Sequence, residues 1–110
     1  MLDFEALTAY LGDDHEIVHA VLSTYHEDHS NALEEIKELM QANNLDELHR
    51  LIHTLKGILT SFGEKTASAA LNNVEIQLLQ GDAINPDDMD VIFEEVAVIN
   101  RQIEQALANN

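Results

Sequence analysis

The sequence predicts an all-α protein: an antiparallel up-down-up-down four-helix bundle with a short additional N-terminal helix. Apolar residues recur at intervals of three and four along most of the 110-residue chain, which is the period of a helix that buries one face. The chain contains a single proline, and it lacks the alternating β-branched runs and the Asn-Gly or Asp-Gly turns that mark hairpins. Helices with such apolar faces, joined by short connections, bury these faces most simply by packing together as a bundle. We expect residues 1–110 to form one domain.

The N-terminal part is expected to begin with a short amphipathic segment that ends at Gly12, and to continue as a longer helical stripe. From Asp14 to residue 42 neither glycine nor proline interrupts the pattern, which allows one long helix. The polar run 27–31 can equally kink or cap it, and the sequence leaves both possibilities open. Asn43-Asn44 then indicates a turn. The inward residues are expected to be Phe4, Leu7 and Leu11 in the first segment and Val18, Val21, Leu22, Tyr25, Ala32, Leu33, Ile36 and Met40 in the second.

Three more helices are expected in the second half of the chain. The first of them stops at Gly63, the next runs from Glu64 to about Leu79, and the last begins after Asn85. Asn85-Pro86 reads as an N-cap followed by a proline in the first helical position. The residues expected to face inward are Leu48, Ile52, Leu55, Leu59 and Phe62, then Ala67, Leu71, Val74 and Leu78, and finally Met89, Ile92, Val96, Ile99, Ile103 and Leu107.

The charge balance excludes several classes of partner. Twenty-one acidic residues face five basic ones, for a formal net charge of −16, so neither nucleic acid nor an anionic membrane is expected to bind. No cysteine is present, which excludes a disulfide framework and a thiolate metal site. The first residues lack the pattern of a signal peptide, and no apolar run approaches the roughly 20 residues that span a bilayer. We therefore expect a soluble, cytoplasmic domain.

The most informative stretch is His53-Thr54-Leu55-Lys56-Gly57. Histidine is the side chain whose unperturbed pKa lies near neutrality, so it can act as a nucleophile without being already protonated. Lys56 shares its helical face, and Gly57 removes side-chain bulk one turn away, although a mid-helix glycine costs about 1 kcal/mol relative to alanine. Three of the five basic residues, Arg50, Lys56 and Lys65, also lie around this histidine in the sequence. The pattern indicates a histidine that takes up an anionic group from a visiting protein.

Glu75 is expected to lie level with His53 on the following helix. His53 precedes Gly63 by ten residues and Glu75 follows it by twelve, which places the two roughly 15 and 18 Å from the turn at about 1.5 Å per residue. Each follows an inward residue, Ile52 or Val74. A carboxylate that accepts from Nδ1–H would fix the tautomer of the imidazole and leave Nε2 as the nucleophile.

The run from His53 to Gly57, with Gly63 ten residues after the histidine, resembles the histidine-containing phosphotransfer (HPt) domains of multistep two-component phosphorelays. The resemblance covers essentially the whole chain, including Glu75 where the family often has Gln or Glu. It implies a four-helix bundle in which His53 carries the phosphoryl group, Lys56 stabilises it and Gly57 clears room for a receiver domain. The chain departs from the family pattern in its large residues at positions where small ones are common: Ile52, Ile58 and Leu59.

The resemblance also implies the partners, which are response-regulator receiver domains and a sensor or hybrid histidine kinase. A receiver domain brings its own aspartate and divalent metal, so no cofactor or metal is expected in this chain. There is no Gly-rich phosphate loop, and we expect a monomeric carrier without kinase or ATPase activity. The residues expected to meet the partner are His49, Arg50, Gly57, Thr60 and Gly63.

Two other functions fit parts of the sequence. His15 and His19, and likewise His49 and His53, are i,i+4 pairs that could share a metal, and Glu16 with His19 matches the Glu-x-x-His element of di-iron bundles. The last helix, however, offers no carboxylate on its inward stripe. The other alternative is an adaptor that binds through a helical face without phosphorylation, but such a degenerate domain would normally lack the histidine. The remaining histidines are expected to be solvated or half-buried.

Overall fold

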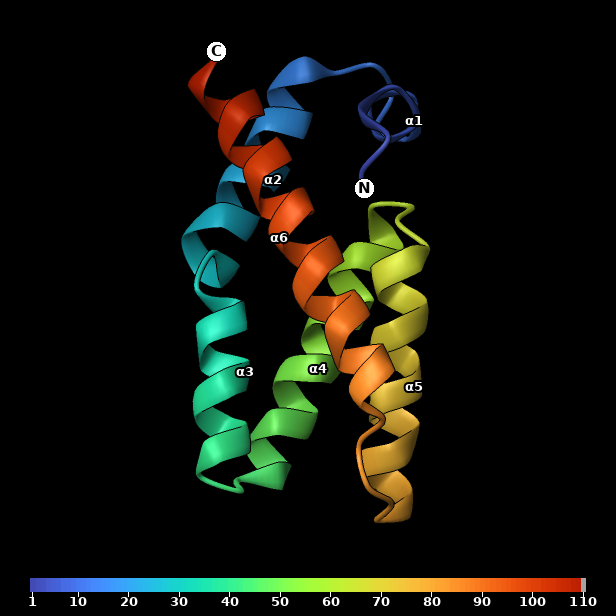
Figure 1. Ribbon diagram of the computed structural model, residues 1–110. Coiled ribbons are helices and arrows are strands. Elements are labelled where there is room, and N and C mark those ends of the chain that lie inside the picture. Colours follow the sequence, from blue (N-terminus) through green and yellow to red (C-terminus); the bar gives the residue numbers. More distant parts are fainter. Residues whose placement is uncertain (110) are drawn as a thin grey trace.

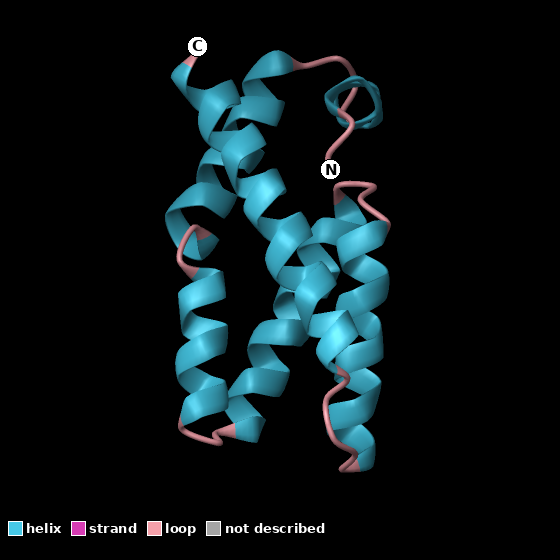
Figure 2. Cartoon of the chain, viewed as in Figure 1, coloured by secondary structure: helices cyan, strands magenta, loops and turns pink. Residues whose placement is uncertain are grey.

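The computed structural model describes residues 1–109, and within that range the chain is helical and contains no strand (Figures 1 and 2). The expected all-α class is therefore confirmed. The helices are α1 (Phe4–Tyr10), α2 (His15–His29), α3 (Ala32–Gln41), α4 (Leu45–Ser61), α5 (Thr66–Gln80) and α6 (Pro86–Ala108). No helix in the described part of the chain is both long enough and apolar enough to cross a bilayer.

The long helices pack side by side in an elongated molecule of 42 × 21 × 19 Å. Figure 1 shows α2 and α3 following one another in the same direction, α4 returning, α5 running back and α6 returning beside them. The closest pairings are α4 with α5 and α5 with α6, and α2 and α3 close the bundle against α6 and α4. The short α1 lies across the end of the bundle near α2. The pairing of α4 with α5 is the one that positions the candidate site.

The stretch from Asp14 to residue 42 forms two helices, which decides between the two possibilities left open by the sequence. Ser30 still donates its backbone N–H to His26 O at 3.2 Å, but Asn31 has left the helical conformation with φ −100° and ψ 12°. Across this break α3 continues on the same side of the molecule, with a change of direction relative to α2 (Figure 1). The polar run 27–31 therefore divides the stripe.

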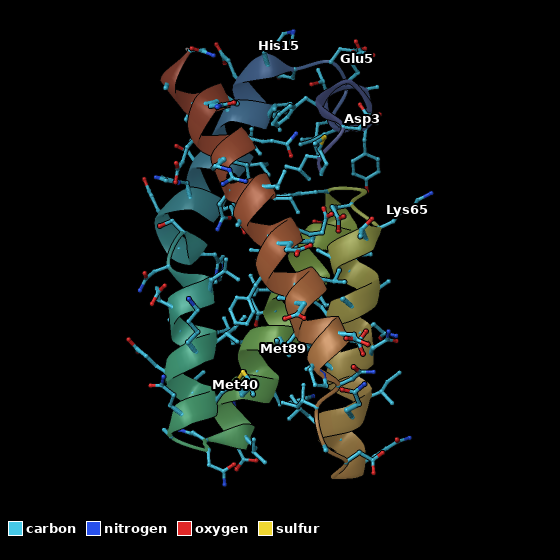
Figure 3. The ribbon with its side chains drawn as sticks, viewed as in Figure 1. Asp3, Glu5, His15, Met40, Lys65 and Met89 are labelled. Atoms are coloured by element: carbon cyan, nitrogen blue, oxygen red, sulfur yellow. The ribbon has the colours of Figure 1, made fainter. Side chains whose placement is uncertain are left out.

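One residue of this stripe was wrongly expected to face inward. Met40, labelled in Figure 3, is 39% exposed. In α3 the buried residues are Ala32 and Ile36, with Leu39 half-buried against the core. Leu39 follows Ala32 by seven residues, almost two complete turns, and so takes the inward position. Met40 is rotated about 100° further round the helix.

The core of α4, α5 and α6 follows the apolar period of the sequence. All the residues expected to face inward in these helices are buried except Leu78 and Leu107, which are half-buried against the same core. The helix ends also follow the sequence signals. Asn85 Oδ1 accepts from the backbone N–H of Asp87 at 2.8 Å, Pro86 opens α6, and Gly81 ends α5 with φ +71°.

The start of α5 differs from the expected boundary. The helix begins at Thr66, not at Glu64, because the Glu64 carboxylate lies outside the helix and accepts from its free N–H groups. These bonds come from the backbone of Thr66, Ala67 and Ser68, at 2.8, 3.1 and 3.0 Å. They supply partners that the first turn of a helix otherwise lacks.

Candidate functional site

The α4–α5 pair brings His53 and Glu75 into contact. Ile52 and Val74 are fully buried in the interface between the helices, and the residue after each emerges at its edge. His53 Nδ1 lies 2.5 Å from Glu75 Oε2. The His53 side chain is 65% exposed, whereas that of Glu75 is only 8% exposed. One edge of the imidazole is therefore anchored, and most of the ring faces solvent.

Glu75 also gathers two further side chains from α4. Lys56 Nζ donates to Oε1, and His49 Nε2 lies 3.3 Å from Oε2. His49 is four residues before His53 and Lys56 three after it, so all three side chains lie on one helical face. The rings of His49 and His53 are stacked, with centroids 6.2 Å apart and planes at 30°.

These contacts keep Glu75 ionised. Burial raises the pKa of the Glu75 carboxyl, but hydrogen bonds from Lys56 and His53, together with their charges, outweigh it and hold this pKa below its usual value. An ionised carboxylate only accepts hydrogen bonds, so the proton in the contact with His53 is carried by Nδ1. In the neutral imidazole, Nε2 then holds a lone pair. The arrangement presents a nucleophilic nitrogen at the surface of α4.

Gly57 leaves open space on the surface of α4, one turn after His53. It is exposed, and a Cβ built on it would meet no other atom within 4 Å. Packing inside the described chain therefore does not require a glycine here. A groove between α2 and α4, which the sequence did not reveal, has a mostly apolar lining made of Ala20, Val21, Thr24, Tyr25, Asp28, His29, Ile58, Ser61 and Phe62.

The other residues expected at the site lie further from Glu75. Thr60 and Gly63 are exposed and line a separate depression with residues of α1, and Gly63 adopts φ +78° in the turn. The Arg50 side chain is 77% exposed and pairs with Glu47 at 3.2 Å. Lys65 is exposed at the start of α5 (Figure 3). Of the three cations near His53 in the sequence, Lys56 is therefore the one that joins the cluster.

The contact between His49 and Glu75 was not foreseen, because His49 was expected to meet a partner protein. Its spacing of four residues from His53 placed it on the right face, but which side of that face meets α5 depends on the rotation of the helix. As for metals, no group of three or more His, Asp or Glu side chains among residues 1–109 is arranged to hold an ion.

A family model described as "Hpt domain" matches residues 20–109, which include the whole cluster around Glu75. This chain belongs to the Hpt domain family. Hpt domains carry phosphoryl groups on histidine in two-component signalling and interact with receiver domains and kinases. No curated protein and no solved structure matches the chain.

Proposed function

We propose that His53 of this Hpt domain accepts a phosphoryl group from the aspartate of a receiver domain, or from a kinase, and passes it to the aspartate of a response regulator. The observation that carries this proposal is the contact between His53 Nδ1 and the ionised Glu75. It supports a fixed tautomer with a free lone pair on the exposed Nε2.

The transfer needs only a positioned nucleophile and stabilisation of charge. The lone pair of Nε2 attacks phosphorus and forms an N–P bond while the bond from phosphorus to the aspartyl oxygen breaks, and that electron pair leaves with the aspartate carboxylate. The proton on Nδ1 stays in place. Its contact with Glu75 offsets the positive charge that the phosphorylated ring acquires. Passing the group on to a response regulator is the reverse of these steps.

Lys56 is proposed to stabilise the phosphoryl group. Its ammonium carries three N–H donors, and the one engaged by Glu75 Oε1 leaves others for phosphoryl oxygens. The Lys56 side chain is 26% exposed. A small rotation of this side chain would bring its ammonium to a phosphoryl group on His53, one turn away.

The partner is proposed to dock over the surface around Gly57, with contributions from Thr60, Gly63, His49 and Arg50. The open space at Gly57 supports this placement. We propose a monomeric, cytoplasmic carrier, one domain over residues 1–110 with antiparallel up-down-up-down topology and a capping N-terminal helix. It would have no kinase or ATPase activity, no nucleic-acid partner, no membrane insertion and no metal or cofactor of its own. The divalent metal would belong to the receiver domain.

The direct test is phosphorylation by a receiver domain that already carries phosphate. The protein should acquire an acid-labile phosphate, and His53→Gln should abolish it while the helical circular dichroism spectrum stays unchanged. His15→Gln, which changes an exposed histidine at the start of α2, is the matched control and should be labelled normally. Labelling of His53→Gln at the level of the parent would refute the assignment.

A further inference from the structure

A buried ring nitrogen next to the reacting histidine lacks a well-aligned partner. Nε2 of His49 is inaccessible to solvent and has no hydrogen bond of good geometry within the described chain. Its nearest charged neighbour is Oε2 of Glu75, at 3.3 Å. The same oxygen receives His53 Nδ1 at 2.5 Å. Two imidazoles from successive turns of α4 therefore converge on one carboxylate oxygen.

The chemistry of the pair determines which group donates. A neutral imidazole has one N–H and one lone pair, and an ionised carboxylate accepts only. A lone pair on Nε2 of His49 would face the negative oxygen and be repelled by it. The proton of His49 is therefore favoured on Nε2, where it donates to Glu75 after a slight rotation of the ring.

We propose that His49 is a positioning residue for the reaction at His53: it holds Oε2 of Glu75 in the place where that oxygen fixes the tautomer of His53. This inference rests on the proposed phosphotransfer function. Lys56 holds the other oxygen of the carboxylate, so His49 and Lys56 together determine how the carboxylate plane is turned. His53 is too exposed to be held by packing alone, because its side chain is 65% exposed.

Loss of the His49 donor has a definite consequence. The carboxylate is then free to turn toward Lys56, and the contact with His53 Nδ1 becomes less populated. A histidine without such a partner favours the proton on Nε2, and that tautomer has no lone pair at the nitrogen that must attack phosphorus. His49→Phe should therefore slow transfer even though it keeps a ring that stacks on His53.

The alternative is that His49 only packs against the ring of His53. Two variants separate the roles. His49→Phe keeps the ring and removes the donor, whereas His49→Gln loses the ring and places an amide N–H near the position of Nε2. A packing role predicts that the Phe variant resembles the parent, and a positioning role predicts that the Gln variant does.

The experiment measures the tautomer of His53 directly, in the unphosphorylated protein labelled with 15N-histidine. Long-range 1H–15N correlation spectra are recorded at pH 8.5, well above the ordinary pKa of about 6.5 for histidine. We expect His53 of the parent and of His49→Gln to carry its proton mainly on Nδ1, and His53 of His49→Phe to shift toward the Nε2–H form. If His49→Phe fails to fold, His49→Asn, whose shorter amide stops short of Glu75, takes its place.

A second measurement links the tautomer to the reaction. With a phosphorylated receiver domain as donor, His49→Phe should accept phosphate about threefold more slowly than the parent, equivalent to roughly 0.65 kcal/mol, and His49→Gln, which keeps the donor, should recover most of this loss. Unchanged 15N shifts of His53 in folded His49→Phe would overturn the inference, as would a Gln variant that behaves like Phe. If the parent accepts no phosphate at all, the proposed function fails, and the tautomer measurement still decides the role of His49.

Discussion

Two buried glutamates on the α5 side of the molecule are held in different ways. Glu64 is 4% exposed, and its carboxylate accepts from three backbone N–H groups at the start of α5. Glu75 is 6% exposed, and it is surrounded by the side chains of His49, His53 and Lys56. The partners of Glu64 are fixed once the helix forms. The partners of Glu75 can rotate, exchange protons or turn toward a phosphoryl group. The carboxylate of Glu75 is therefore suited to a reaction, and that of Glu64 to stability.

The sharpest way to break this comparison is to remove the carboxylate of Glu75. We expect Glu75→Ala to slow phosphotransfer roughly a hundredfold, which corresponds to about 2.7 kcal/mol in the barrier, because His53 loses the acceptor that keeps its proton on Nδ1. A timed transfer assay from a phosphorylated receiver domain measures the rate. The melting temperature of the same variant should fall only slightly, since Lys56 and His53 can turn to solvent and only His49 Nε2 loses a buried neighbour. A normal transfer rate would remove Glu75 from the mechanism.

The reciprocal change at Glu64 should affect stability and spare the reaction. Glu64→Ala leaves the N–H groups of Thr66, Ala67 and Ser68 without their acceptor, and we expect a loss of about 2 kcal/mol in the free energy of unfolding. Urea titration gives this value. At a temperature where the variant is fully folded, its rate of phosphotransfer should equal that of the parent. A large fall in rate without loss of stability would mean that the two carboxylates do not divide the roles.

Gly57 tests whether the exposed side of the cluster serves a partner. Since a Cβ at this position meets no atom of the chain, Gly57→Gln should leave the melting temperature equal or higher, because replacing a mid-helix glycine gains helix propensity. Phosphotransfer should fall at least tenfold, about 1.4 kcal/mol, because the longer side chain obstructs the receiver domain. Gly57→Ala is the matched control and should transfer faster than the Gln variant. A variant that loses stability together with transfer would show that Gly57 serves packing.

Particular residues show how much of the fold and of the site the sequence predicts. The apolar period of α4 and α5 predicted the burial of Ile52 and Val74, and counting from Gly63 placed Glu75 level with His53. That estimate worked because both helices are regular and the turn between them is short. The period did not place Met40, because Leu39 and Met40 follow Ile36 by three and four residues and either spacing continues the apolar face; the structure turns Leu39 toward the core.

The three cations around His53 in the sequence illustrate the same limit at the site. Sequence proximity suggested that Arg50, Lys56 and Lys65 act together, but only Lys56 contacts Glu75, while Arg50 pairs with Glu47. Spacing along a helix specifies which residues share a face. It does not specify which of them a neighbouring helix meets, and this is why the contact of His49 with Glu75 emerged only from the structure.

The smallest effect we predict is a pH dependence of stability that originates at Glu75. Its pKa in the folded protein lies below the usual value because hydrogen bonds and charges from Lys56 and His53 outweigh the opposing effect of burial. A carboxyl with a lowered folded pKa stabilises the protein fully above its unfolded pKa, about 4.3 for glutamate, and that contribution is lost as the pH falls through the folded value. Urea titrations at steps from pH 6 down to pH 3 should therefore show a decline that is shallower in Glu75→Gln. Lys56→Met removes one cause of the lowered pKa, so its curve should fall between those of the parent and Glu75→Gln. Parallel curves for all three proteins would mean that the carboxylate of Glu75 is not held by these side chains, and the contrast with Glu64 would lose its electrostatic basis.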